Sequence, residues 1–214
     1  TKIPFSGVYV AMHGSTSDST IAIHRGTRVR KNHTSRRDAF ESIDASPVAF
    51  FKDGKVKILN EDLVLKDSSR QFKVSCKFEK AVGLIKFHPS FNHKLIDHLV
   101  DSGYRGIVLE GTGLGHLSND CYQSIKSAVK KGLLVGMTSQ CIWGRVNLTV
   151  YDSGRDLLKH GVIPLGDMLS ETALVKMMWA LGNTQSKKKA ERLMLENIAG
   201  EYLERSPFER RQKI

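Results

Sequence analysis

Short apolar segments alternate with polar ones along the first sixty residues, which is the pattern of half-buried strands. Residues 7–13 and 19–24 predict two strands joined by a polar turn. The apolar runs 47–51 and 56–59 lie on either side of the turn 52–55, whose Asp-Gly pair is a strong hairpin signal. This part of the chain is therefore expected to consist mainly of strands connected by turns.

From residue 81 the pattern changes to apolar runs that alternate with amphipathic segments. The predicted strands are 82–87, 106–109 and 133–137, and two helices between them end at Gly103 and Gly132. This β-α-β-α-β-α order implies a parallel sheet with right-handed crossovers. The first helix is supported by Leu95, Ile96, Leu99 and Val100 on one face, and the second by Ser118 or Asn119 as its cap and by Ile125, Ala128 and Val129. A third helix is predicted over 152–159. Two more helices close the chain: one begins after Ser170 and buries Leu174, Val175, Met178 and Leu181, and the other spans 188–203.

Between these two regions, residues 60–80 are charged and weakly periodic, and they predict a linker. A chain of 214 residues is long enough for one or two cores. The chain begins with Thr1, and residues 7–12 already have the pattern of a core strand. We therefore expect a fragment whose amino-terminal portion is absent.

Composition narrows the function classes. The net charge of +11 favours a polyanionic partner such as RNA, although a surface rich in Lys and Arg gives the same excess. No apolar run approaches the roughly 20 residues needed to span a membrane. The three cysteines are odd in number and lack the spacing of a zinc or redox motif, which predicts a reducing, cytoplasmic compartment.

Two segments at the carboxyl ends of predicted strands are candidates for binding. Residues 110–116 form a Gly-x-Gly-x-Gly loop, which lets a backbone approach a ligand closely but is equally typical of a tight turn. Residues 138–141 follow the next strand, and Cys141 has no histidine partner in sequence, so a buried, inert thiol is expected. His88, His93 and His98 do not share a helix face and are expected to lie on the surface without metal. No metal or cofactor site is predicted in this chain.

The polar run 30–42 contains Lys31 beside several arginines. Cations crowded together lower the pKa of a lysine, which suits proton shuttling or nucleophilic work. A solvated basic turn explains the same residues. From local chemistry both interpretations of Lys31 remain open.

Ordered motifs across nearly the whole chain resemble the threonine-dependent L-asparaginase family, and within it the archaeal amidotransferase branch. The resemblance implies an α/β, asparaginase-like two-domain fold: the remainder of a first α/β domain over 1–66, a linker over 67–80, and a smaller parallel-sheet, flavodoxin- or Rossmann-like α/β domain over 81–214. The segments that carry it are 8–12, 26–34, 38–42, 103–116, 138–147, 161–164, 171–182 and 197–201.

The resemblance also implies a mechanism. In that family a threonine attacks the side-chain amide of glutamine or asparagine, while a second threonine, an aspartate and a lysine relay protons and ammonia leaves. Lys31 matches the relay lysine and is the one catalytic residue predicted here. Both threonines and the aspartate belong to a family segment upstream of residues 8–12, and the similar-looking run 13–18 comes too late in the order to replace it.

The loops distinguish branches of the family. Secreted asparaginases have asparagines around the glycine loop and a glutamate that reaches the neighbouring subunit's site. Here the loop contains Gly113, Leu114, Gly115 and His116, and the glutamate position falls near Tyr151. This favours the amidotransferase branch, with a free cytosolic L-asparaginase and an inactive interaction module as alternatives.

The amidotransferase branch implies particular partners. The ammonia would pass to a partner subunit that uses ATP and Mg²⁺ to activate Glu-tRNA(Gln), within a heterotetramer that contains a homodimer of this subunit. The chain itself would hold no cofactor and contact no membrane.

Overall fold

The computed structural model describes residues 5–59, 63–69, 71 and 73–205 and divides the chain into two compact units. The first contains residues up to Val74 together with the described residues from Ala199 on, and the second contains Ser75–Ile198. The division falls within the predicted linker 67–80. The predicted second domain extended to residue 214, whereas the described residues 199–205 group with the first unit.

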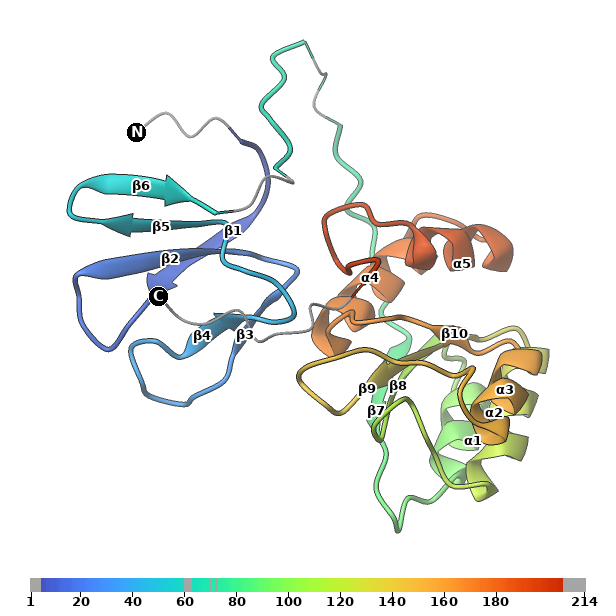
Figure 1. The fold of residues 1–214 in the computed structure, drawn as a ribbon. Coiled ribbons are helices and arrows are strands. Elements are labelled where there is room, and N and C mark those ends of the chain that lie inside the picture. The colour runs from blue at the N-terminus through green and yellow to red at the C-terminus, as the bar shows by residue number, and fades with distance from the viewer. Residues whose placement is uncertain (1–4, 60–62, 70, 72, 206–214) are drawn as a thin grey trace. The chain divides into compact units, whose positions relative to one another are not determined.

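The first unit contains an antiparallel sheet with the strand order β1-β2-β5-β6 (Figure 1). The predicted hairpin at 52–55 is confirmed, because β5 pairs with β6 and both turn residues, Asp53 and Gly54, have positive φ. A separate two-stranded ribbon of β3 and β4 carries the basic run that contains Lys31. The bounds are β1 Tyr9–His13, β2 Thr20–Arg25, β3 Val29–Lys31, β4 Phe40–Ser42, β5 Ala49–Lys52 and β6 Lys55–Ile58.

The second unit is the parallel α/β unit that the sequence predicts, with strand order β10-β9-β8-β7 (Figure 1). Gly103 and Gly132 follow the first two helices with positive φ, as expected for glycines at helix ends. The strands are β7 Val82–Lys86, β8 Gly106–Gly111, β9 Leu134–Ser139 and β10 Ile163–Pro164, and the helices are α1 Lys94–Asp101, α2 Asp120–Lys130, α3 Asp152–Lys159, α4 Ser170–Gly182 and α5 Lys187–Leu195.

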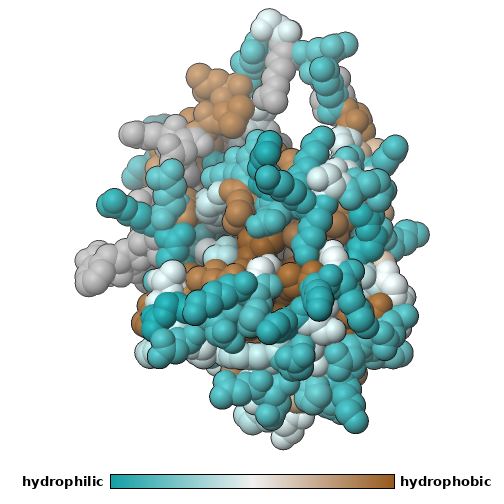
Figure 2. Space-filling model, turned by 90° about the vertical axis from the view of Figure 1, so that its right-hand side faces the viewer, coloured by the Kyte–Doolittle hydropathy of each residue, from teal (hydrophilic) through white to brown (hydrophobic). Residues whose placement is uncertain are grey.

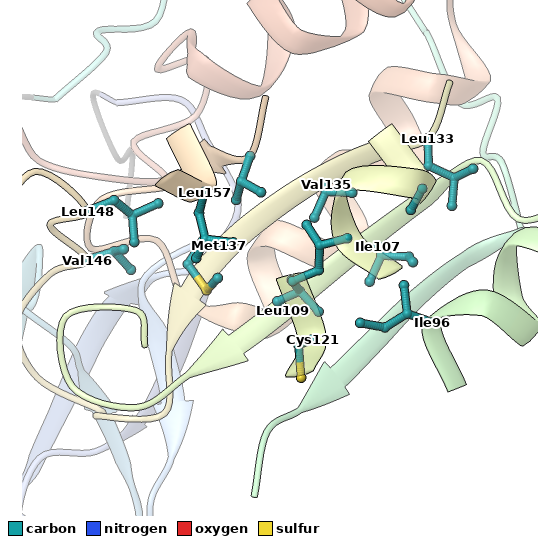
Figure 3. Packing of buried hydrophobic residues seen from close by; sticks show 13 residues of the cluster. Ile96, Ile107, Leu109, Cys121, Leu133, Val135, Met137, Val146, Leu148 and Leu157 are labelled. Carbon is teal, nitrogen blue, oxygen red and sulfur yellow. The ribbon is translucent and has the colours of Figure 1, made fainter. Parts of the chain in front are cut away.

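Alternate residues of β8 and β9 face opposite layers of helices. Ile107 and Leu109 point toward the helices α1, α2 and α3, where they join one buried cluster (Figure 3). A Cβ atom added at Gly106 or Gly136 would instead meet Met177 of α4 on the other face. The glycines therefore let α4 pack closely against the sheet, and the unit has three layers.

Several local predictions differ from the structure. Leu95, expected on the buried face of α1, is 52% exposed. Val175 is 53% exposed, and α4 buries Ala173 and Met177 instead. The last helix ends at Leu195, before the predicted end at 203, and the chain continues without helix into Gly200, which has a positive φ. Asn119 occupies the position before α2, but its side chain makes no capping hydrogen bond.

Polar side chains cover most of the molecular face in Figure 2, and hydrophobic residues show between them. Among the described residues, no helix combines the length and the apolar character that crossing a membrane requires. In the same part of the chain, no group of three or more His, Cys, Asp and Glu side chains is arranged to hold a metal ion.

Candidate active site

Lys31 is the last residue of β3 and lies directly opposite Phe40 of β4. Its side chain is exposed, and its amine lies 5.9 Å from the centroid of the Phe40 ring, within the range of a cation–π contact. One residue further, the N–H of Asn32 donates to the carbonyl of Ala39 at 2.7 Å. Lys31 is thus presented by an ordered ribbon, at the end where the connecting loop begins.

That loop pairs two of the arginines near Lys31 with carboxylates. Arg36 donates two hydrogen bonds to Asp38, at 2.8 and 2.5 Å, and the bond to Asp38 raises the pKa of the Arg36 guanidinium. Arg37 forms an ion pair with Asp18. The crowd of cations that the sequence suggests around Lys31 is therefore partly neutralised by acidic neighbours.

In the second unit, the glycine loop after β8 is a tight turn held by its neighbours. Thr112 and His116 exchange backbone hydrogen bonds at 2.9 Å, and Gly113 and Gly115 have positive φ. The hydroxyl of Ser139 donates to the carbonyl of Gly113 at 2.6 Å. A side chain at Gly115 would collide with the core, so this glycine is required by close packing as well as by its backbone conformation.

Two loop residues of the second unit, His116 and Tyr151, touch each other. The rings of His116 and Tyr151 meet edge to face with centroids 4.9 Å apart. The hydroxyl of Ser153 lies 3.4 Å from Nδ1 of the same histidine. His116 and Tyr151 therefore act as one aromatic contact in this unit.

The expectation of a buried Cys141 is wrong. This cysteine is exposed because β9 ends two residues earlier, at Ser139, whose hydroxyl accepts the N–H of Cys141 at 3.0 Å. The next residue back, Gln140, is tied by its side-chain amide to the carbonyls of Phe87 and Glu110. The first two residues after β9 are thus held by hydrogen bonds to Ser139 and to the neighbouring strands.

Arg28, to which the sequence alone assigned no role, is 1% exposed at the open end of the Lys31 ribbon, where β3 begins and β4 ends. Its guanidinium binds the carbonyls of Ile43 and Glu201. The signal available in the sequence was the family likeness of residues 26–34 and 197–201. Nothing local indicates that these two segments meet.

A strand-rich first unit with a lysine-bearing ribbon, together with a four-stranded parallel α/β unit, is the architecture of the asparaginase family. The chain belongs to this family: residues 81–194 match the Glutaminase/Asparaginase C-terminal domain, and residues 1–64 match the domain described as Asparaginase, N-terminal. The predicted two-domain, asparaginase-like fold is therefore confirmed.

Curated relatives place the chain in one branch of this family, as predicted. It is 55% identical over 195 residues to the D-type subunit of glutamyl-tRNA(Gln) amidotransferase from Pyrococcus furiosus, covering 91% of this chain and 44% of that protein. The corresponding protein of Thermococcus kodakarensis is 51% identical over 203 residues, covering 94% and 46%. The chain spans about half the length of the curated relatives it matches.

A solved structure gives the same fold. The thermostable L-asparaginase from Thermococcus kodakarensis superimposes with a TM-score of 0.77 at 32% identity, covering 93% of this chain and 58% of that one. Similarity at this level extends through both units of the chain.

Proposed function

We propose that these 214 residues are part of the ammonia-releasing subunit of a tRNA-dependent amidotransferase. The subunit hydrolyses the side-chain amide of glutamine or asparagine, and the ammonia converts Glu-tRNA(Gln) to Gln-tRNA(Gln) on a partner subunit. In this proposal the partner binds ATP and Mg²⁺, and two copies of the present subunit lie within a heterotetramer.

One comparison carries the choice between branches. Thermococcus kodakarensis contains both a D-type amidotransferase subunit and an L-asparaginase that resemble this chain. The chain is 51% identical to the former and 32% identical to the latter, over nearly the same share of its length. Because organism and growth conditions are the same for both, the difference supports membership of the amidotransferase branch over a free asparaginase.

Lys31 is the catalytic residue that we assign to this chain. In the proposed reaction, a threonine hydroxyl attacks the amide carbon, the C–N bond breaks, and the nitrogen leaves as ammonia after taking up a proton. Water then cleaves the resulting threonine ester, which releases the side-chain carboxylate and restores the hydroxyl. The Lys31 amine would move protons between the threonine and the departing nitrogen. Its position on an ordered ribbon, with the amine exposed, supports this role because a relay group must be held within hydrogen-bond reach of its partners.

The contact between His116 and Tyr151 supports the same branch. The glutamate with which secreted asparaginases reach the neighbouring subunit's site would be replaced here by the aromatic pair of His116 and Tyr151.

The test uses a chimera that adds the upstream part of the Pyrococcus furiosus relative to this chain. Ammonia release from glutamine and asparagine is measured alone and with the partner subunit, Glu-tRNA(Gln), ATP and Mg²⁺. The proposal predicts release that rises with the partner and tRNA, together with formation of Gln-tRNA(Gln). Fast asparagine turnover that ignores the partner would identify a free asparaginase, and no release under any condition would favour an interaction module.

A further inference from the structure

Buried hydrogen bonds fix the open end of the Lys31 ribbon, at which β3 begins and β4 ends. Arg28 directly precedes β3 and Ile43 directly follows β4, and the backbone N–H of Ile43 donates to the carbonyl of Arg28 at 2.8 Å. The Nε atom of Arg28 donates to the carbonyl of Ile43 at 3.1 Å. The arginine thus closes the two strands with its side chain as well as with its backbone.

The same guanidinium reaches a segment far along the chain. Its Nη1 atom donates to the carbonyl of Glu201 at 3.0 Å, in a side chain that is only 1% exposed. The neighbouring Thr27 donates its hydroxyl toward the carbonyls of Ala199 and Gly200, at 3.0 and 3.2 Å. Two consecutive residues before β3 therefore hold one short segment, Ala199–Glu201, against the ribbon.

The held segment has a defined conformation of its own. The Glu201 carboxylate accepts the N–H of Ala199 at 2.8 Å, and Gly200 between them has a φ of +72°. This positive φ favours glycine at position 200, whereas the nearby Arg25 guanidinium, 2.4 Å from where a Cβ atom would lie, is the movable end of a side chain. The segment Ala199–Glu201 therefore has an ordered backbone conformation against which the ribbon is held.

We propose that Arg28 is a positioning residue for Lys31, which it holds in place by joining the open end of the ribbon to Ala199–Glu201. This inference rests on the proposed function, because a positioned amine has meaning only where it relays protons. Lys31 lies three residues from Arg28, about 10 Å along the strand, so a tilt at the open end displaces the amine. A displacement of about 1 Å can cost about a hundredfold in rate.

Arginine has the geometry for this task and lysine lacks it. The planar guanidinium presents several donors in a fixed fork, which here serve carbonyls of two separate segments. A lysine at position 28 keeps the charge but has a single nitrogen at the end of a flexible stem. R28K therefore keeps the positive charge but removes the hydrogen bonds by which one side chain joins Ile43 to Glu201.

The experiment compares R28K with R192K in the chimera, because Arg192 is an exposed arginine on α5 of the second unit and takes no part in the Lys31 ribbon. Glutamine hydrolysis is measured as kcat, KM and their pH dependence, with the folded fraction determined by circular dichroism at the assay temperature. We expect R28K to lower kcat at least about tenfold and to shift the pH–rate profile, while KM changes less than about threefold. R192K should keep kcat within about twofold.

Each outcome has one meaning. If the unmodified chimera releases no ammonia, the proposed function fails and the inference fails with it. If the chimera is active and R28K matches it in kcat and pH profile, only the inference is overturned. A loss that merely follows the folded fraction, with an unchanged pH profile, also overturns it. If R28K does not fold, T27V replaces it: a fall in kcat with a shifted pH profile supports the inference, and unchanged kcat overturns it.

Discussion

The Nδ1 atom of His24 on β2 lies 2.9 Å from the hydroxyl oxygen of Ser42 on β4, and this contact joins the sheet of the first unit to the Lys31 ribbon. The histidine is 2% exposed, and its Nε2 atom has no hydrogen-bond partner among the described residues. Burial lowers the pKa of His24 to about 4, and the charge of Glu41 offsets this only in part. The folded chain therefore keeps His24 neutral.

This contact predicts that the chain loses stability on mild acidification. The unfolded chain takes up a proton on His24 below about pH 6.5, whereas the folded chain does so only near pH 4. Above pH 6.5 His24 is neutral in both states and costs no stability, whereas the free energy of unfolding falls as the pH decreases from 6.5 to 4. At about 1.4 kcal/mol for each pH unit between the two values, the loss approaches about 3 kcal/mol. Urea unfolding at a series of pH values measures it.

The matched control for that measurement is a second histidine. H24Q should flatten the pH dependence between about 4 and 6.5, whereas H98Q, which changes an exposed histidine, should leave the slope as it was. An unchanged slope in H24Q would show that His24 does not remain neutral inside the fold.

The cysteines should differ in reactivity. Cys76 and Cys141 are exposed, whereas Cys121 is buried, and burial, with a smaller effect of the Asp120 charge, raises the pKa of its thiol. Since the thiolate is the reactive form, an aromatic disulfide reagent should modify two thiols quickly in the native protein and the third only after unfolding. C141S should leave one fast thiol, and rapid modification of all three thiols in the native protein would contradict the packing of α2.

Gly154 should resist substitution even though it lies in a helix. Alanine at an exposed helical position usually stabilises by about 1 kcal/mol relative to glycine. At this site the added Cβ would lie 2.4 Å from the carbonyl oxygen of Leu148, a backbone atom that has little freedom to move. We expect G154A to destabilise by about 2 kcal/mol or more in thermal unfolding, with K159A on the same helix as a near-neutral control. A stabilised G154A would contradict the approach of α3 to this loop.

Much of the fold follows from local sequence. The positive φ values of Gly103 and Gly132 mark helix ends that the sequence predicted, and the Asp53-Gly54 turn sets the hairpin of β5 and β6. These features need only neighbouring residues, and therefore a pattern along the chain can reveal them. The order of strands in the second unit then follows from alternation with helices.

The support of Lys31 was not predictable in the same way. Thr27 and Ala199 lie 172 positions apart, and hydrogen bonds to backbone carbonyls leave no trace in the residue types that provide them. Val175 was misassigned because helix α4 has apolar residues around much of its circumference, so that periodicity does not select the buried face. Lys31 itself could be assigned a role only through the family resemblance.

The most direct test of the proposed function measures ammonia release from glutamine by the chimera carrying K31A, beside K57A as an exposed lysine of the same unit. Removing a proton-relay group typically costs about a hundredfold or more in rate. We predict a loss of this size in K31A, with the folded structure and the rate of K57A unchanged. Near-normal ammonia release by K31A would contradict the assignment of this chain's catalytic residue.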